Sequence, residues 1–158
     1  MLPGRHTGSG CSQECFAATW VSNSESRMSL HLMEYAWTQP RRPGEGTRVS
    51  CTRFLPRGVR KEDYAREGYF DVWLPPLAPS RDLVKWAKTH DLSDRTTMTE
   101  FVRRYRHEIA HSDARHMIRT LAKLAEVTPI SVGCSCKTPH CHRFELERLI
   151  RAAAAGKF

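Results

Sequence analysis

The pattern of hydrophobic and polar positions changes along the chain near residue 28. Residues 1–28 are rich in Gly, Ser and Thr and show no apolar period near 3.6 or 2, which is typical of a segment without a packed core. We therefore interpret 1–28 as a flexible tail or as the product of a wrongly chosen start codon, since Met28 stands where the ordered pattern begins. Residues 29–158 have the usual length of one domain and are predicted to form it.

Three short segments have the composition of β-strands. Residues 30–37 and 47–54 flank a loop rich in Pro and Gly, and residues 130–134 form a short apolar run. The second strand should end at residues 56–58, because Pro cannot donate to a ladder and Gly permits the turn. Residues 59–79 are predicted to be a long, partly ordered connection.

Four further segments have helical periodicity. Ser80 can cap the first helix, because its side-chain oxygen can accept from N–H groups of the first turn. Thr97 or Thr99 can begin the second helix. Apolar residues spaced four apart predict its buried face: Phe101, Tyr105 and Ile109.

Of the last two predicted helices, one precedes the third strand segment along the chain and the other follows it. Ser112 opens one helix, which ends at residues 128–129 because the residue before Pro disfavours the helical conformation. Residues 141–155 form the other. Strands interleaved with helices predict an α/β fold.

Composition favours a protein of the cytoplasm. Apolar residues make up 40% of the chain and charged residues 27%, and no apolar run approaches the roughly 20 residues of a membrane span. The longest apolar stretch of the amino terminus, 16–21, is shorter than the core of an export signal. In the cytoplasm the six cysteines would stay thiols or bind metal.

The formal net charge of +8 favours polyanionic partners such as nucleic acid or a phosphorylated small molecule. A generally basic surface without a specific partner explains the charge equally well. If a basic patch exists, we expect it on the predicted helices, at Arg103, Arg104, Arg106, Arg115 and Arg119.

Residues 134–143 connect the third strand to the last helix and concentrate the reactive side chains. Such loops bind ligands in open α/β sheets, because backbone N–H groups and the helix dipole converge there. A thiol at this helix terminus, near Arg143 and Lys137, would have a stabilised thiolate. The loop contains Cys134, Cys136, His140, Cys141, His142 and Arg143.

Three interpretations of this loop remain open. In the first, Cys141 or Cys134 is a reactive thiol, His142 or His140 transfers protons, and Arg143 holds an anion. In the second, zinc binds the sulfur and imidazole donors of Cys134, Cys136, Cys141 and His142. The absence of paired two-residue knuckles counts against zinc. In the third, the cysteines pack at a strand end and His142 caps the helix. No cofactor is expected, with zinc as the alternative.

Other candidates lie outside the loop. Tyr105 and Glu108 are three residues apart on one predicted helix, so both could reach the same space, with Glu108 as a base or as a partner of Arg143. A core tyrosine beside a solvated charge is the alternative. Arg53 and Arg57 could bind phosphate from a strand end, although surface salt bridges explain them equally well.

Four blocks of sequence together resemble a known family. RVSCTRFLPRGV, WLPPLAPSRDLVKW, EFVRRYRHEIA and ISVGCSCKTPHCHR are similar, in order and spacing, to the bacterial and archaeal family called domain of unknown function 488 (DUF488), in its YeaO-like branch. The resemblance covers residues 30–150 and implies a compact three-layer Rossmann-like α/β domain with a small, mostly parallel sheet. It carries over the family pattern to Arg53, Pro56, Arg57, Gly58, Trp73, Pro79, Ser80, Trp86, Tyr105, Glu108, Cys134, Cys141, His142 and Arg143.

The resemblance supplies no reaction, and two positions depart from it. Thr52 replaces an Asp and Leu55 replaces a Trp, so a mechanism that needs the acid is in doubt here. Two hypotheses follow. The chain is an enzyme with a Cys/His/Arg site that acts on a nucleotide or nucleic acid, or it is a non-enzymatic binder of nucleic acid, an anion or a metal.

Overall fold

The computed structural model describes residues 28–33, 40–136 and 138–158. The predicted tail, 1–28, lies outside this part of the chain apart from Met28, as does the second half of the first predicted strand, 34–37. Among the described residues, no helix combines the length and the apolar composition needed to cross a membrane.

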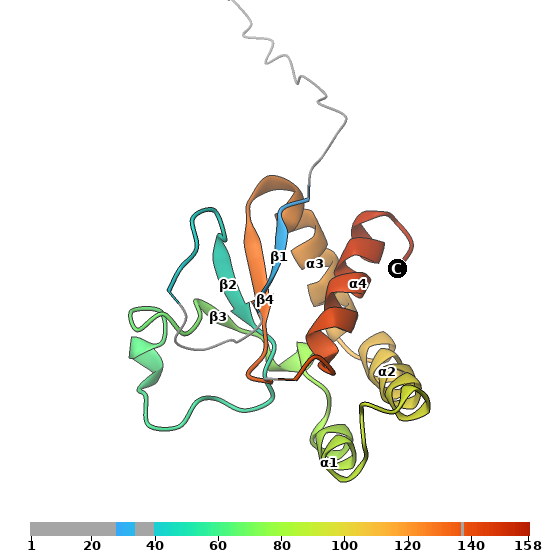
Figure 1. Ribbon diagram of the computed structural model, residues 1–158. Coiled ribbons are helices and arrows are strands. Elements are labelled where there is room, and N and C mark those ends of the chain that lie inside the picture. The colour runs from blue at the N-terminus through green and yellow to red at the C-terminus, as the bar shows by residue number, and fades with distance from the viewer. Residues whose placement is uncertain (1–27, 34–39, 137) are drawn as a thin grey trace, which may run out of the picture.

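A parallel sheet of four strands forms the centre of the fold (Figure 1). Its strands are β1 (Leu30–Met33), β2 (Thr47–Ser50), β3 (Val72–Trp73) and β4 (Ile130–Gly133), in the order β1-β4-β2-β3. β4 pairs with β1 and β2, and every pairing is parallel. The central position of β4 explains its continuous apolar character, since strands buried on both faces do not alternate.

Four helices follow or precede these strands. They are α1 (Arg81–Thr89), α2 (Arg95–Ala110), α3 (Ala114–Val127) and α4 (His142–Ala154). Two 3₁₀ turns, η1 (Lys61–Asp63) and η2 (Pro75–Leu77), interrupt the long connection that contains β3. In Figure 1, α3 and α4 lie beside the sheet, while α1 and α2 lie near the end at which the strands terminate. The predicted α/β class is therefore confirmed.

The helices cover one face of the sheet, and irregular segments cover the other. Side chains from β1, β2 and β4 join the helices in one core: Leu30, Val49, Ile130 and Val132. On the opposite face Arg48 is 1% exposed. Its guanidinium donates to Glu45 and to the carbonyl oxygens of Pro40 and Gly68. A third layer of loops therefore packs on a polar face of the sheet.

Several predicted boundaries differ from the structure. β2 ends at Ser50 and not at residue 54, and β3 was expected only as part of a connection. α2 begins before Thr97, because Asp94 is its N-cap and accepts from the Thr97 N–H at 2.7 Å. Ser80 caps α1 as predicted, accepting from the Leu83 N–H at 3.1 Å.

Candidate functional site: a three-cysteine cluster

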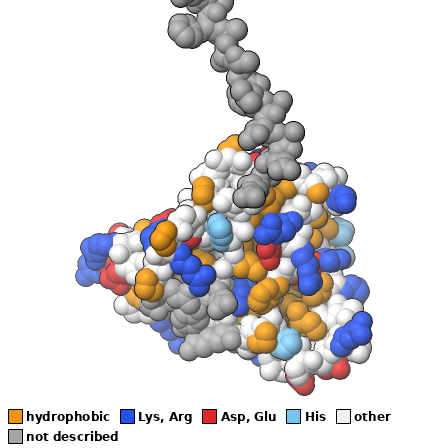
Figure 2. Space-filling model, turned by 45° about the horizontal axis from the view of Figure 1, so that its top comes forward, with side chains coloured by type: hydrophobic (Ala, Val, Ile, Leu, Met, Phe, Trp, Pro, Cys, Tyr) orange, Lys and Arg blue, Asp and Glu red, His pale blue; other side chains and the backbone are white. Residues whose placement is uncertain are grey.

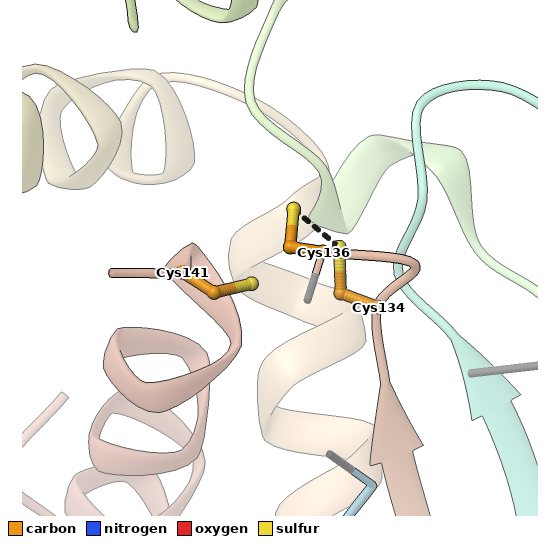
Figure 3. A group of neighbouring side chains, drawn as sticks. All are labelled: Cys134, Cys136 and Cys141. Atoms are coloured by element: carbon orange, nitrogen blue, oxygen red, sulfur yellow. Dashed lines mark hydrogen bonds between the residues drawn. The ribbon is translucent and has the colours of Figure 1, made fainter. Parts of the chain in front are cut away.

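Three thiols meet in the loop between β4 and α4. Cys134 directly follows the last residue of β4, and Cys141 is the N-cap of α4. Together with Cys136 their sulfur atoms lie within 4.8 Å of one another, and Figure 3 shows all three directed into one space. Cys134 donates a hydrogen bond to Cys136 across 3.3 Å between the sulfur atoms. A short loop thus gathers thiols that are up to seven positions apart in sequence.

The three thiols differ in their ionisation. Hydrogen bonds from Cys134 and Cys141 lower the pKa of Cys136, and the positive charge of Arg143 acts in the same direction. Donation to Cys136 raises the pKa of Cys134. A hydrogen bond with Cys134 favours ionisation of Cys141, but donation to Cys136 and burial outweigh it and raise the pKa of Cys141. Cys136 is therefore the thiol of the cluster whose ionisation its neighbours favour.

His142 lies beside the cluster, and its contacts define which of its two ring nitrogens faces Cys141. Its Nε2 lies 2.9 Å from the carbonyl oxygen of Cys51, and a carbonyl only accepts, so Nε2 carries the proton. Nδ1 then presents its lone pair to Cys141, whose sulfur lies 3.7 Å away. Burial lowers the pKa of His142, so the ring is neutral at pH 7. Nδ1 is therefore available as a hydrogen-bond acceptor for the Cys141 thiol.

Arg143 supports the loop from inside the protein. It is 4% exposed, and its Nη1 donates to the carbonyl oxygen of Cys136 at 2.8 Å. Within the described residues, its Nε is the buried side-chain nitrogen without a hydrogen-bond partner. Arg143 does not line the cavity described below, although it was predicted to hold an anion. Its positive charge therefore acts on the cluster from a position outside the cavity wall.

A cavity of about 390 Å³ adjoins the cluster. Cys134, Cys136 and Cys141 all line it, and among the described lining residues there is no carboxylate. Besides the three thiols, the cationic or titratable groups on its wall come from Arg53, Lys88, His140 and His142. Apolar side chains such as Phe54 and Leu92 complete it. The cavity therefore combines positive charge with an apolar surface.

Arg53 is the one predicted phosphate ligand on this wall. Its Nε donates to the carbonyl oxygen of Pro79 at 2.7 Å, and its Nη2 donates to that of Ala78. These bonds fix the guanidinium beside the start of α1. Arg57 is exposed in the turn that Gly58 forms with a φ of +80°, and it does not line the cavity.

The structure places Tyr105 and Glu108 outside the cavity. The Tyr105 hydroxyl donates to the carbonyl oxygen of Leu77 at 2.7 Å. The rings of Tyr105 and His142 form a T-shaped contact with 5.5 Å between their centroids. The Glu108 carboxylate accepts from the Ser80 hydroxyl and N–H. It does not contact Arg143.

The arginines predicted to form a basic patch are in part ion-paired. Arg103 and Arg104 both contact Glu100, and Arg106 contacts Glu145, which is 2% exposed. On the face shown in Figure 2, Lys and Arg side chains are interspersed with acidic and hydrophobic ones. The face shown therefore offers no continuous positive patch.

Sequence reasoning missed two contributors to the site. Cys51 is fully buried, its thiol donates to the Gly133 carbonyl at 3.0 Å, and its own carbonyl orients His142. Lys88 reaches the cavity from the last turn of α1. No local signal marks either residue, because the pairing of β2 with β4 and the position of α1 bring them to the loop.

Comparisons with known proteins identify relatives of this chain. The chain is 36% identical over 89 residues to uncharacterised proteins of Mycobacterium bovis and Mycobacterium tuberculosis, which covers 56% of this chain and 69% of each relative. No solved structure matches. The placement in a YeaO-like branch stays a prediction. A family model for DUF488-N3a, described as the active DUF488-N3 subclade, matches residues 32–154, and the chain therefore belongs to the DUF488 family.

Proposed function

We propose that this protein is an enzyme that binds a small anionic molecule in the cavity and attacks it with the sulfur of Cys136. The observation that carries the proposal is geometric. Cys136 is the half-buried member of the cluster, it accepts a hydrogen bond from Cys134, and it lines a cavity with a positively charged wall. The subclade to which the chain is matched is described as active, which supports an enzyme over a purely structural domain.

Cys136 has the surroundings that nucleophilic catalysis requires. A thiolate and not a thiol is the attacking species, and the neighbouring thiols stabilise the charge by donating to it. The electron pair of the Cys136 sulfur forms a bond to an electrophilic carbon or phosphorus, and the leaving group departs with its bonding pair. A thiol of Cys134 or Cys141 then supplies a proton to the leaving group.

His142 positions one of the thiols that can supply this proton. Its neutral Nδ1 faces the Cys141 sulfur at 3.7 Å and can accept a hydrogen bond from this thiol before the thiol gives its proton to the leaving group. Cys51 holds the ring in the required tautomer through its carbonyl. This differs from the roles predicted from the sequence, in which Cys141 or Cys134 attacked directly.

The cavity wall indicates the class of substrate. Arg53 and Lys88 favour an anionic group such as a phosphate or carboxylate, and Phe54 with Leu92 offers an apolar surface for the rest of the molecule. A nucleotide satisfies both features, which is the substrate class expected from the sequence.

The rate of iodoacetamide modification at each cysteine, measured between pH 5.5 and 8 by peptide mapping, tests the proposal. We expect Cys136 to react at a nearly constant rate over this range, because it is already ionised. Cys11 and Cys15, two cysteines of the segment 1–28 that lie outside the described residues, serve as reference thiols in the same chain, and a free thiol gains about tenfold per pH unit below its pKa of about 8.5. Adenosine monophosphate should slow the modification of Cys136 and leave the reference thiols unchanged.

Two variants and one contrary result complete the test. Cys136→Ser should remove the pH-independent reaction, whereas Cys15→Ser, the matched control, should keep it. A Cys136 that reacts more slowly than Cys15 and with the same pH dependence would refute the proposed nucleophile.

A further inference from the structure

We propose that the sulfur atoms of Cys134, Cys136 and Cys141 together bind one thiophilic metal ion, for which Zn²⁺ is the matching divalent ion. This inference goes beyond the proposed enzymatic function and does not require it, because it depends only on the positions of the three sulfur atoms and on the charges around them. A metal-bound and a metal-free form of the same cluster would have different chemistry.

The spacing of the sulfur atoms agrees with a single ion. Zinc binds thiolate sulfur at about 2.3 Å in tetrahedral geometry, which places two such sulfurs about 3.8 Å apart. The three sulfur atoms all lie within 4.8 Å of one another, and Cys134 and Cys136 are 3.3 Å apart. Shifts of about 1 Å or less would bring all three to the ideal spacing. The sequence argued against zinc because the loop lacks paired two-residue knuckles, but in the structure the loop folds back on itself and brings its three sulfur atoms together.

Rigid elements hold the ligands in place. Cys134 follows the central strand β4, Cys141 begins the 13-residue helix α4, and Arg143 holds the backbone of Cys136 through its carbonyl. The backbone at Gly133 is also closely packed, because a Cβ at that position would lie 2.8 Å from the Cβ of Met33. The strand end is therefore packed closely against β1, and little conformational entropy remains to be lost when an ion binds.

The charges around the cluster favour a metal-thiolate group. Three thiolates and one divalent ion carry a net charge of −1, which the neighbouring guanidinium of Arg143 offsets. That side chain is buried, and its Nε has no hydrogen-bond partner among the described residues. The positive end of the α4 dipole acts in the same direction. Carboxylates are absent from the described cavity lining, so the donors select soft ions and not Mg²⁺ or Ca²⁺.

The fourth coordination position faces the cavity. All three cysteines line that space, so a water molecule or a substrate atom can complete a tetrahedron, as in zinc sites with three protein ligands. His142 was the fourth ligand predicted from the sequence. Its ring nitrogens are not part of the compact group that the sulfur atoms form, although Nδ1 lies near Cys141. The structure therefore assigns His142 a position beside the ligand set.

Titration of the reduced, metal-free full chain with Zn²⁺ tests the inference, with a chromophoric chelator as competitor. We expect one equivalent to bind. Replacing one ligand in Cys136→Ser should weaken binding by about 100-fold or more, since even residues outside the ligand set change metal affinity by 10- to 100-fold. Cys15→Ser, which keeps all three cysteines of the cluster, should bind as the parent chain does. Equal affinity of Cys136→Ser and the parent chain would overturn the inference.

Cobalt provides a second measurement that does not depend on a variant. Co²⁺ bound to thiolates shows a sulfur-to-cobalt charge-transfer band in the near ultraviolet, and one equivalent of Zn²⁺ should abolish it. A Co²⁺ complex without this band would show that other donors bind the ion and would also overturn the inference.

The metal site and the proposed nucleophile can fail separately. Zn²⁺ at one equivalent should protect Cys134, Cys136 and Cys141 from iodoacetamide and leave Cys11 and Cys15 reactive. If Zn²⁺ does not bind while Cys136 still shows its pH-independent reaction, the metal inference is wrong and the proposed function stands. If Zn²⁺ binds and the metal-free protein lacks that reaction, the reverse holds.

Discussion

Replacing Glu108 tests whether this residue acts in chemistry or in structure. Its carboxylate joins α2 to the beginning of α1, because Oε2 accepts from the Ser80 N–H at 2.8 Å and Oε1 accepts from the Ser80 hydroxyl. The hydroxyl oxygen in turn accepts from the Leu83 N–H at 3.1 Å. Glu108 thus orients the N-cap of α1 so that its proton points to the carboxylate and its lone pairs point to the helix.

The contacts allow an estimate of the effect on stability. A hydrogen bond to a charged group contributes about 1.5–3 kcal/mol, and loss of a Ser N-cap costs about 0.5–2 kcal/mol. Because the carboxylate is only half-buried, we expect the lower end, so that Glu108→Ala lowers the free energy of unfolding by about 2–3 kcal/mol. Glu108→Gln keeps one acceptor oxygen and should lower it by about 1 kcal/mol.

Urea denaturation measures these changes. With a slope of about 2 kcal/mol per molar urea, Glu108→Ala should lower the midpoint by about 1 M. Glu126→Gln is a matched control, because Glu126 forms a surface ion pair with Lys123, and such a pair contributes less than about 1 kcal/mol. A double-mutant cycle with Ser80→Ala should give a coupling of about 1 kcal/mol.

The same variants distinguish structure from catalysis. The rate at which iodoacetamide modifies Cys136 should change less than twofold in Glu108→Gln, because the carboxylate does not line the cavity. A tenfold slower modification in a variant that is as stable as the parent chain would refute this reasoning, and Glu108 would then be the base that the sequence indicated.

Three further predictions concern stability. Arg48→Met should lower the free energy of unfolding by about 3–5 kcal/mol because it leaves the buried Glu45 without its ion-pair partner, and the double variant with Glu45→Gln should recover part of this loss in urea denaturation. Burial would raise the pKa values of Glu45 and Asp71, but hydrogen bonds from arginine side chains and backbone N–H groups lower both pKa values. The thermal midpoint should therefore be constant at a pH above the ordinary pKa values of 4.5 and 3.8 and fall as the pH drops below them. An unchanged thermal midpoint at pH 3 would contradict this. Tyr105→Phe should lower stability by about 1–2 kcal/mol, measured by urea denaturation, because the carbonyl oxygen of Leu77 loses its donor in the core.

Local sequence signals predicted most helices but did not place the ends of several helices and strands correctly. Ser80 after a proline predicted the start of α1 correctly, because the capping interaction involves residues three apart. The start of α2 was misplaced because Asp94, Thr97 and Thr99 are all plausible caps, and only the structure shows that the Asp94 carboxylate accepts from Thr97. β3 has two residues and pairs with β2 alone, so its formation depends on a partner more than on its own sequence.

The sequence predicted which loop forms the candidate site but not how the side chains of the site are arranged. The order of strand, cysteines and helix identified residues 134–143, since parallel strands end at the ligand-binding edge of a sheet. Assigning roles within the loop required distances. Glu108 and Arg143 are separate although both were assigned to one site, and Arg53 alone of the three predicted anion ligands lines the cavity.

Position along the loop explains why Cys136 differs from its neighbours. Cys134 follows the end of β4, and Cys141 is the N-cap of α4. They are 3% and 2% exposed, so an ionised sulfur at either position would lose most of its hydration. Cys136 lies between them, half-buried, where two thiols can donate to it and the cavity keeps one side open. An attacking sulfur needs both charge stabilisation and access, and a metal ligand needs close neighbours. Cys136 satisfies these requirements together, so replacing it alone tests both proposals, and replacing either neighbour would also disturb the packing of β4 or α4.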